Sequence, residues 1–94
     1  MKTQEELQKE VLTAHWIDMR FHLQRGNLFS VREDLRLEDV GFALASDRVS
    51  LVQGWIEEGA LLRLEDSAQF AKEELFSILI VQPFVLAQKA KEKT

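Results

Sequence analysis

Residues 37–64, LEDVGFALASDRVSLVQGWIEEGALLRL, predict two short helices that are joined by a tight turn and followed by a strand. Apolar residues recur at helical spacing on either side of Asp47, which is placed to cap the second helix, and Gly59 is placed to end it. Gly54 lies inside the second helix, where glycine costs about 1 kcal/mol against alanine, so we expect a close backbone contact there. This order of elements is typical of a helix-turn-helix with its first wing strand.

The segment before this stretch predicts a long first helix. Residues 5–25 have a helical composition, and Gly26 can end a helix in the left-handed conformation. Apolar residues form stripes on two nearly opposite sides of the segment, so the helix is either sandwiched within its fold or shared with a partner. We identify Ile17 and Phe21, in the second stripe, as candidate interface residues. Alternatively, Thr13 caps a new helix and divides the segment in two, and the sequence leaves this open.

Three short segments predict strands. Residues 28–31 and 60–64 are short apolar runs, and residues 76–81 are nearly all apolar and rich in β-branched or aromatic side chains. Residues 84–88 follow a proline and predict an edge strand or a final turn. A pattern resembling a capping box at Asp66 and Gln69 predicts a short helix around residues 70–74.

The order helix, strand, helix, helix, strand, excursion, strand is that of a winged helix. We therefore expect an α+β fold in which a three-helix core is covered by a small three-stranded antiparallel sheet, with an enlarged wing. The main rival is another small α+β arrangement with one sheet face packed on helices. Residues 1–88 would form this single domain, and residues 89–94 a charged flexible tail. The expected core includes Trp16, Val52, Trp55 and Ile80.

Composition and charge exclude several functions. The chain has 94 residues and no cysteine, which excludes disulfides, thiolate zinc sites and cysteine nucleophiles and favours a reducing compartment. The first ten residues are too polar for a signal peptide, and the longest apolar run is too short to span a bilayer, so we expect a cytoplasmic protein without membrane contact. The net charge is −4 while the tail from Lys89 carries +2, so the body carries −6 and repels phosphate backbones.

Three stretches, HWIDMRFHLQRGNLFSV, DRVSLVQGWIEEGALLRL and ILIVQPFVLAQ, together carry a family resemblance. Their features are Trp16, His22, Arg25 and Gly26, then Asp47 and Trp55, and finally the strand Gln82 to Leu86. Over residues 7–88 the chain resembles a family of small bacterial proteins known only as a domain of unknown function, number twenty-two eighty-eight. The resemblance implies a small, single-domain cytosolic protein and brings no activity, ligand or catalytic residue.

The helix-turn-helix segment is poorly suited to DNA. Residues 37–59 carry one arginine against five carboxylates, a net charge of −4. Only Arg48, Ser50 and Gln53 are suited to contact bases. The carboxylates would repel the DNA phosphates, so the helix would lack the electrostatic attraction that normally supplies most of the DNA affinity. Nucleic-acid binding by this helix is therefore not expected.

The remaining polar groups give weak signals. Basic side chains are concentrated between residues 20 and 36, and these are our candidates for contact with an anion or an acidic partner. Helix capping, pairing with Glu33 and Asp34, or simple solvation would account for their presence equally well. His15 and His22 lie two helical turns, or about 10 Å, apart, so one metal ion cannot bridge them, and Asp18 pairing with a histidine is the simpler reading. The basic candidates are Arg20, His22, Arg25, Arg32 and Arg36.

Catalysis and cofactors have no support in the sequence. It contains no nucleophile elbow, P-loop, dinucleotide fingerprint or zinc-protease motif, so we expect no enzyme, no metal and no cofactor. The function that the residues favour is a non-catalytic protein–protein interaction module, working as a homodimer or with another protein. The alternative is a DNA-binding transcriptional regulator that uses its wing or the region from Arg20 to Arg36. A third, weaker reading is a small-anion sensor at the arginines.

Overall fold

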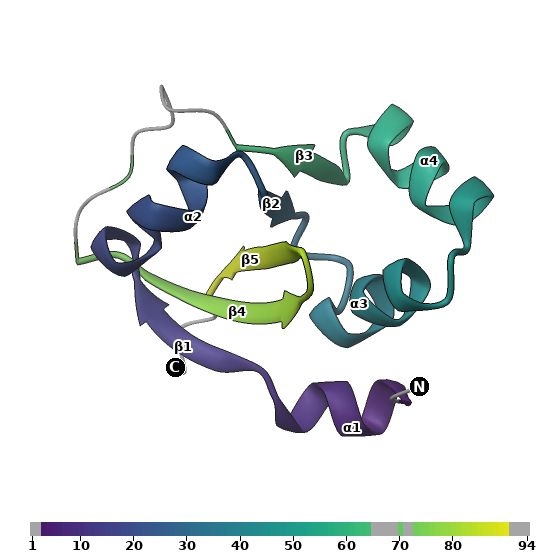
Figure 1. The fold of residues 1–94 in the computed structure, drawn as a ribbon, viewed down its shortest axis with the longest axis horizontal. Helices are drawn as coiled ribbons and strands as arrows, with labels where there is room; N and C mark the ends of the chain where they lie inside the picture. The colour runs from purple at the N-terminus through teal and green to yellow at the C-terminus, as the bar shows by residue number, and fades with distance from the viewer. Residues whose placement is uncertain (1–2, 65–69, 71–72, 91–94) are drawn as a thin grey trace.

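The computed structural model describes residues 3–64, 70 and 73–90, in which four α-helices and one 3-10 helix (η1) surround a single five-stranded sheet (Figure 1). The α+β class is therefore confirmed. In chain order the elements are α1 (Gln4–Lys9), β1 (Leu12–His15), η1 (Trp16–Met19), α2 (Arg20–Arg25), β2 (Leu28–Val31), α3 (Leu37–Ala45), α4 (Val49–Glu58), β3 (Leu61–Arg63), β4 (Leu75–Val81) and β5 (Phe84–Lys89).

The sheet differs from that of the expected winged helix. Its strand order is β1-β4-β5-β2-β3, and β2 pairs with β5 in parallel while the other three pairs are antiparallel. The expectation of three antiparallel strands is therefore wrong in number and in direction. The physical reason is that β5 returns between β4 and β2, which gives both of its edges a partner and leaves it in the centre of the sheet.

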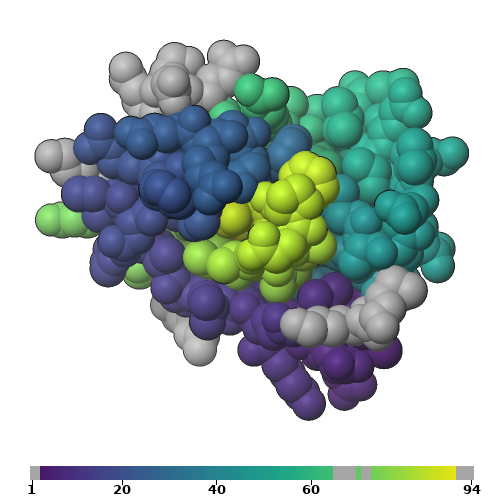
Figure 2. Space-filling view, in the orientation of Figure 1, coloured from purple at the N-terminus to yellow at the C-terminus, as the bar shows by residue number. Residues whose placement is uncertain are grey.

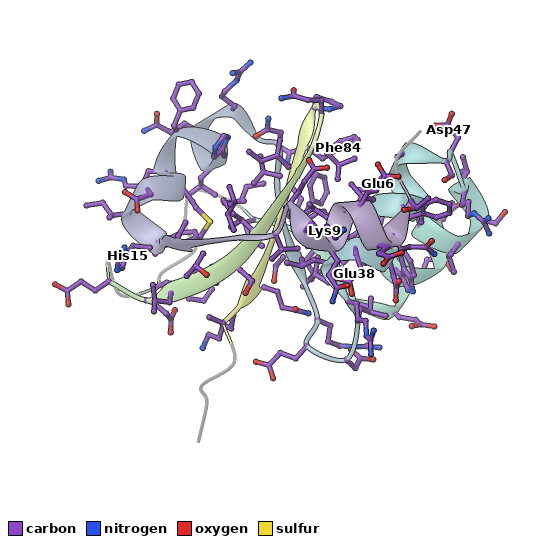
Figure 3. The ribbon with its side chains drawn as sticks, turned by 90° about the horizontal axis from the view of Figure 1, so that it is seen from below. Glu6, Lys9, His15, Glu38, Asp47 and Phe84 are labelled. Atoms are coloured by element: carbon purple, nitrogen blue, oxygen red, sulfur yellow. The ribbon has the colours of Figure 1, made fainter. Side chains whose placement is uncertain are left out.

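Both faces of the sheet carry a core. On face A, which η1 and α2 cover, Ile78 and Val85 lie in one buried cluster with Trp16. On face B, which α1 and α3 cover, the next residues of the same strands, Leu79 and Leu86, lie in a second cluster. Successive strand residues point to opposite faces, so the apolar run of β4 supplies both clusters. Figure 3 shows the sheet nearly edge-on between the two helical layers.

The predicted continuous helix over residues 5–25 is wrong. Thr3 caps α1 by accepting a hydrogen bond from the Glu6 amide, and α1 ends at Lys9. The chain then forms β1, in which Leu12 pairs with Ile78 of β4, before η1 begins at Trp16. Thr13 lies within this strand rather than capping a helix. Pairing with a strand more than sixty positions away overrides the local helical composition, and the two apolar stripes serve different elements.

The last strand is also placed differently from the prediction. β5 is central rather than an edge strand or a final turn. Lys89 belongs to β5, and the Ala90 amide donates to the carbonyl of Leu75, so the predicted tail cannot begin at residue 89. Residues 91–94 of that tail, and most of the predicted wing with its capping box and short helix, lie outside the described residues.

Ile80 and Gly54 are further corrections. Ile80 was expected in the core, yet it is 42% exposed because it points to face A beyond the area that η1 and α2 cover. A Cβ at Gly54 would meet nothing within 4 Å, so no close contact requires a glycine there. The close approach occurs instead at Gly41 of α3, where a Cβ would lie 2.8 Å from Leu79 Cδ2. Gly41 thus lets α3 lie directly on the sheet.

The helix ends follow the sequence more closely. Gly26 and Gly59 end α2 and α4 in the left-handed conformation, as predicted. Asp47 does not cap α4, because it has a positive φ of 55° and Arg48 is the N-cap residue, without a side-chain capping bond. Asp47 serves as the turn between α3 and α4 instead. None of the helices within the described ranges has the length and apolar character of a bilayer-spanning segment.

Candidate functional site: an apolar groove along α4

Helix α4 has apolar side chains that the fold does not bury. None of its ten residues is buried, whereas α3 buries four of its nine. Val49, Leu51 and Ile56 of α4 are 68%, 46% and 49% exposed. Trp55 and Val52 are half-buried against the face-B cluster and attach the helix to the domain. Large exposed apolar side chains that gather on one element indicate a contact surface.

A groove runs beside this helix, between α4, the end of α3 and the start of β5. It encloses about 450 Å³ and continues into a smaller, deeper hollow of about 120 Å³. Both parts share four apolar side chains, so they form one feature, which we name the α4 groove. In Figure 2 the yellow β5 segment lies at the surface against the teal α3–α4 hairpin. The shared residues are Leu44, Val52, Ile56 and Phe84.

Local structure sets the two walls of the groove. The chain turns sharply after α3, where the Ser46 hydroxyl donates to the Phe42 carbonyl and the Arg48 amide to the Ala43 carbonyl. This turn directs α4 away from the sheet. The opposite wall is Phe84, whose ring contacts Phe29 edge-on at 5.6 Å between centroids. Figure 3 shows Phe84 beside the strands and Asp47 at the outer end of the hairpin.

The charges on the α3–α4 hairpin beside the groove are mainly negative. The α3–α4 hairpin has one cation, Arg48, which also lines the groove and lies over the Phe42 ring at 5.6 Å from its centroid. Asp47 lines the groove, and Glu57 follows the groove residue Gln53 by one helical turn on the same side of α4. An apolar floor with carboxylates at its rim is suited to an apolar ligand with cationic ends.

The predicted basic group is divided by the structure. Arg20, His22 and Arg25 lie on α2, before β2, whereas Arg32 and Arg36 follow β2 on the way to α3. Four residues of extended strand separate the two sets by roughly 13 Å of backbone. The arrangement therefore gives two small basic surfaces rather than one anion site.

Each basic surface has contacts of its own. The Arg32 guanidinium donates to both carboxylate oxygens of Asp34, at 2.9 Å for Nη2 to Oδ2, and lies 3.8 Å from Glu58. The hydrogen bond from Arg32 lowers the pKa of Asp34 and raises that of Arg32. Arg25 lies over the Phe21 ring at 5.4 Å, and no described contact involves the Arg20 guanidinium. Arg36 lines a separate polar hollow on face B together with Glu33, Asp34 and Glu38.

The remaining predicted residues have simple positions. Asp18 accepts a hydrogen bond from the His15 amide at 3.4 Å and lies 3.7 Å from His15 Nδ1, as the simpler reading predicted. No group of metal-ligating side chains suited to an ion occurs among the described residues. Ile17 and Phe21 are both exposed, on η1 and α2, and do not reach the α4 groove. Trp16 is buried in the face-A cluster, where it contacts Phe76.

Sequence reasoning missed the α4 groove. The apolar stripe of α4 was interpreted as core, and Phe84 as part of a terminal strand. One signal pointed to it: Val49 and Leu51 lie outside the stripe formed by Val52, Trp55 and Ile56, so α4 has more apolar residues than one core-facing stripe needs.

The comparisons with known proteins agree with the fold but give no activity. A family model described as "Protein of unknown function (DUF2288)" matches residues 2–89. The NMR solution structure of PA1075 from Pseudomonas aeruginosa is similar to this structure, with a TM-score of 0.81 and 28% sequence identity over 94% of this chain and 84% of that chain. No curated protein matches the chain.

Proposed function

The chain belongs to the family of proteins of unknown function DUF2288, as its sequence resemblance predicted, and we propose that it is a non-catalytic protein-interaction module. Its α4 groove binds an amphipathic helix of a partner protein that has apolar residues on one side and lysine or arginine at its ends. In this proposal the protein acts in the cytoplasm without a cofactor.

The observation that supports this proposal is the exposure of α4. Val49 and Ile56 present apolar surface along the rim of a groove whose floor, formed by Leu44, Val52 and Phe84, is also apolar. Removing such surface from water contributes about 25 cal/mol per Å². A partner that covers it therefore gains free energy without unfolding any part of the domain, because Trp55 and Val52 already hold α4 in place.

The chemistry of the partner follows from the shape and charge of the groove. The groove is elongated along α4, and a helix presents its apolar residues at i, i+3 or i+4, and i+7 along a matching line. Asp47, which lines the groove, and Glu57, one helical turn beyond Gln53, attract cations, while Arg48 at the same groove lies over the Phe42 ring. Charge complementarity of this kind mainly raises the association rate and selects against acidic partners.

A titration of the isotope-labelled protein followed by amide NMR shifts tests the proposal. The probe is a synthetic helix of roughly 14 residues, about four turns, with leucines on one side and lysines at both ends. The matched control peptide has glutamates in place of the lysines. We expect the lysine peptide to shift the amides of Val52, Gln53, Ile56 and Phe84, and to bind about tenfold more tightly than the glutamate peptide, a difference of about 1.4 kcal/mol that added salt reduces.

The control protein is the groove variant Val49→Gln/Ile56→Gln, which places a good helix former at both positions. It should lose most of the shifts while its far-UV circular dichroism stays unchanged. If the shifts instead centred on Ile17 and Phe21, or were absent with every peptide, the groove would not be the binding site. A gel shift of random duplex DNA at low salt would support the regulator alternative instead.

A further inference from the structure

One edge of the sheet, β1, carries no lysine, arginine or carboxylate that would block pairing. β1 is the outer strand of the sheet and consists of Leu12, Thr13, Ala14 and His15. The opposite edge, β3, has only three residues and includes Arg63. Proteins usually protect exposed edges with lysine, proline or a bulge, because an edge strand is a template for pairing with another chain. β1 has none of these, so it is open to a further strand.

The backbone direction along β1 shows which residues face outward. The Trp16 amide donates to the Glu74 carbonyl on the β4 side. Hydrogen-bonding groups in an antiparallel pair alternate along the strand, so Leu12 and Ala14 also direct their backbone groups to β4. Thr13 and His15 therefore direct theirs away from the sheet. The His15 amide is occupied by Asp18, which leaves Thr13 as the centre of the open edge.

A second copy of this chain fits that edge in one register. With a two-fold axis at Thr13, each Thr13 amide donates to the carbonyl of the other Thr13, and Leu12 of each copy lies opposite Ala14 of the other. This register keeps every side chain on its own face. The two Leu12 side chains become diagonal neighbours across the axis on face A. Leu12 is 58% exposed in the single chain, so the pairing covers apolar surface as well as backbone groups.

We propose that the β1 edge is the interface of a homodimer in which two five-stranded sheets join into one ten-stranded sheet. Figure 3 looks onto this edge, where β1 runs from His15 toward α1. An unrelated extended peptide is a poorer occupant, because Asp18 limits the free backbone to the neighbourhood of Thr13. Few hydrogen bonds are available to any occupant, and a second copy adds the diagonal contact between the two exposed Leu12 side chains. This inference does not depend on the α4 groove.

A charge exchange at the two-fold axis tests the proposal. In the proposed register Thr13 of one chain lies opposite Thr13 of the other chain. The Thr13→Lys and the Thr13→Glu variants therefore each place two like charges next to one another at the interface. The side chain is exposed in the single chain, so both variants should keep the circular dichroism spectrum of the folded chain. In sedimentation experiments on the full chain, we expect the wild type to have twice the mass of one chain and each variant to have the mass of one chain. An equimolar mixture of the two variants should return to the dimer mass.

Two controls make the outcome specific. Thr13→Val keeps the backbone donor and adds no charge, so it should remain a dimer, and Leu51→Lys on α4 should also leave the dimer unchanged. A wild-type chain that stays monomeric at the highest soluble concentration would overturn the proposal. So would lysine and glutamate variants that both remain dimeric, because this would place the interface elsewhere, or a mixture that fails to pair. Peptide binding at the α4 groove should be the same in all Thr13 variants, which separates this interface from the proposed function.

Discussion

Helices α3 and α4 are neighbours in sequence, similar in length and both amphipathic, yet the fold uses them differently. α3 lies on face B with Gly41 against Leu79, and it buries Leu37 and Val40 completely or nearly so. α4 starts after the turn at Asp47, beyond the sheet, and buries no residue completely. Periodicity shows that a helix has an apolar side, but only its position relative to the sheet decides whether the fold covers that side.

The largest expected difference is between two leucine truncations. Leu37→Ala on α3 removes buried atoms and leaves a cavity, so it should lower the free energy of unfolding by about 2–5 kcal/mol. Leu51→Ala on α4 removes an exposed side chain, so the loss should be within about 0.5 kcal/mol. Urea denaturation of both variants measures the difference. Equal losses would show that α3 and α4 contribute to the core alike.

The same substitution at the two helix glycines should have opposite signs. Gly41→Ala places a methyl group 2.8 Å from Leu79 Cδ2 and 3.1 Å from Val81 Cγ2, and Leu79 is fully buried, so at least one of these side chains must shift within the core. Overpacking of this kind should cost about 1–3 kcal/mol, part of which the better helix propensity of alanine offsets. Gly54→Ala meets no atom, so it should stabilise the protein by up to about 1 kcal/mol. Thermal unfolding checks both, and a stabilising Gly41→Ala would contradict the close approach of α3.

The smallest effect concerns the exposed ion pair between Arg32 and Asp34, in the segment between β2 and α3. Arg32 lowers the pKa of Asp34 in the folded state, so the pair contributes stability above the ordinary carboxyl pKa of 3.8 and loses it as the pH falls through the lower folded value. Stability of the wild type should therefore decrease slightly more below about pH 4 than that of Asp34→Asn. Urea midpoints near neutral pH and in acid measure this, and identical pH profiles would show that the exposed pair contributes nothing.

Elements with strong local signals could be predicted from the sequence. The apolar stripes and the glycine at residue 59 placed α3 and α4 almost correctly, and residues 28–31 form β2 with the predicted bounds. β1 could not be predicted, because Leu12–His15 has little strand character of its own and is extended only through its pairing with β4. The central position of β5 depends on its parallel pairing with β2, which no nearby residue indicates.

The candidate site was harder to predict than the fold. The groove brings Val52 and Ile56 against Phe84, residues that are about thirty positions apart and that were assigned to the core and to a terminal strand. Arg32 and Asp34 are close in sequence, and their pairing was anticipated as one of the simple explanations of the basic group. Contacts between neighbours in sequence can thus be anticipated, whereas a groove between distant elements requires the complete topology.

In the proposed function, the outer apolar face of α4 serves a partner and is not needed for folding. The free energy of unfolding of the groove variant Val49→Gln/Ile56→Gln, measured by urea denaturation against the wild type, tests it most directly. We expect a change within about 1 kcal/mol, because both side chains are about half or more exposed. A loss of several kcal/mol would contradict the account, since it would show that these side chains belong to the core that holds the domain together.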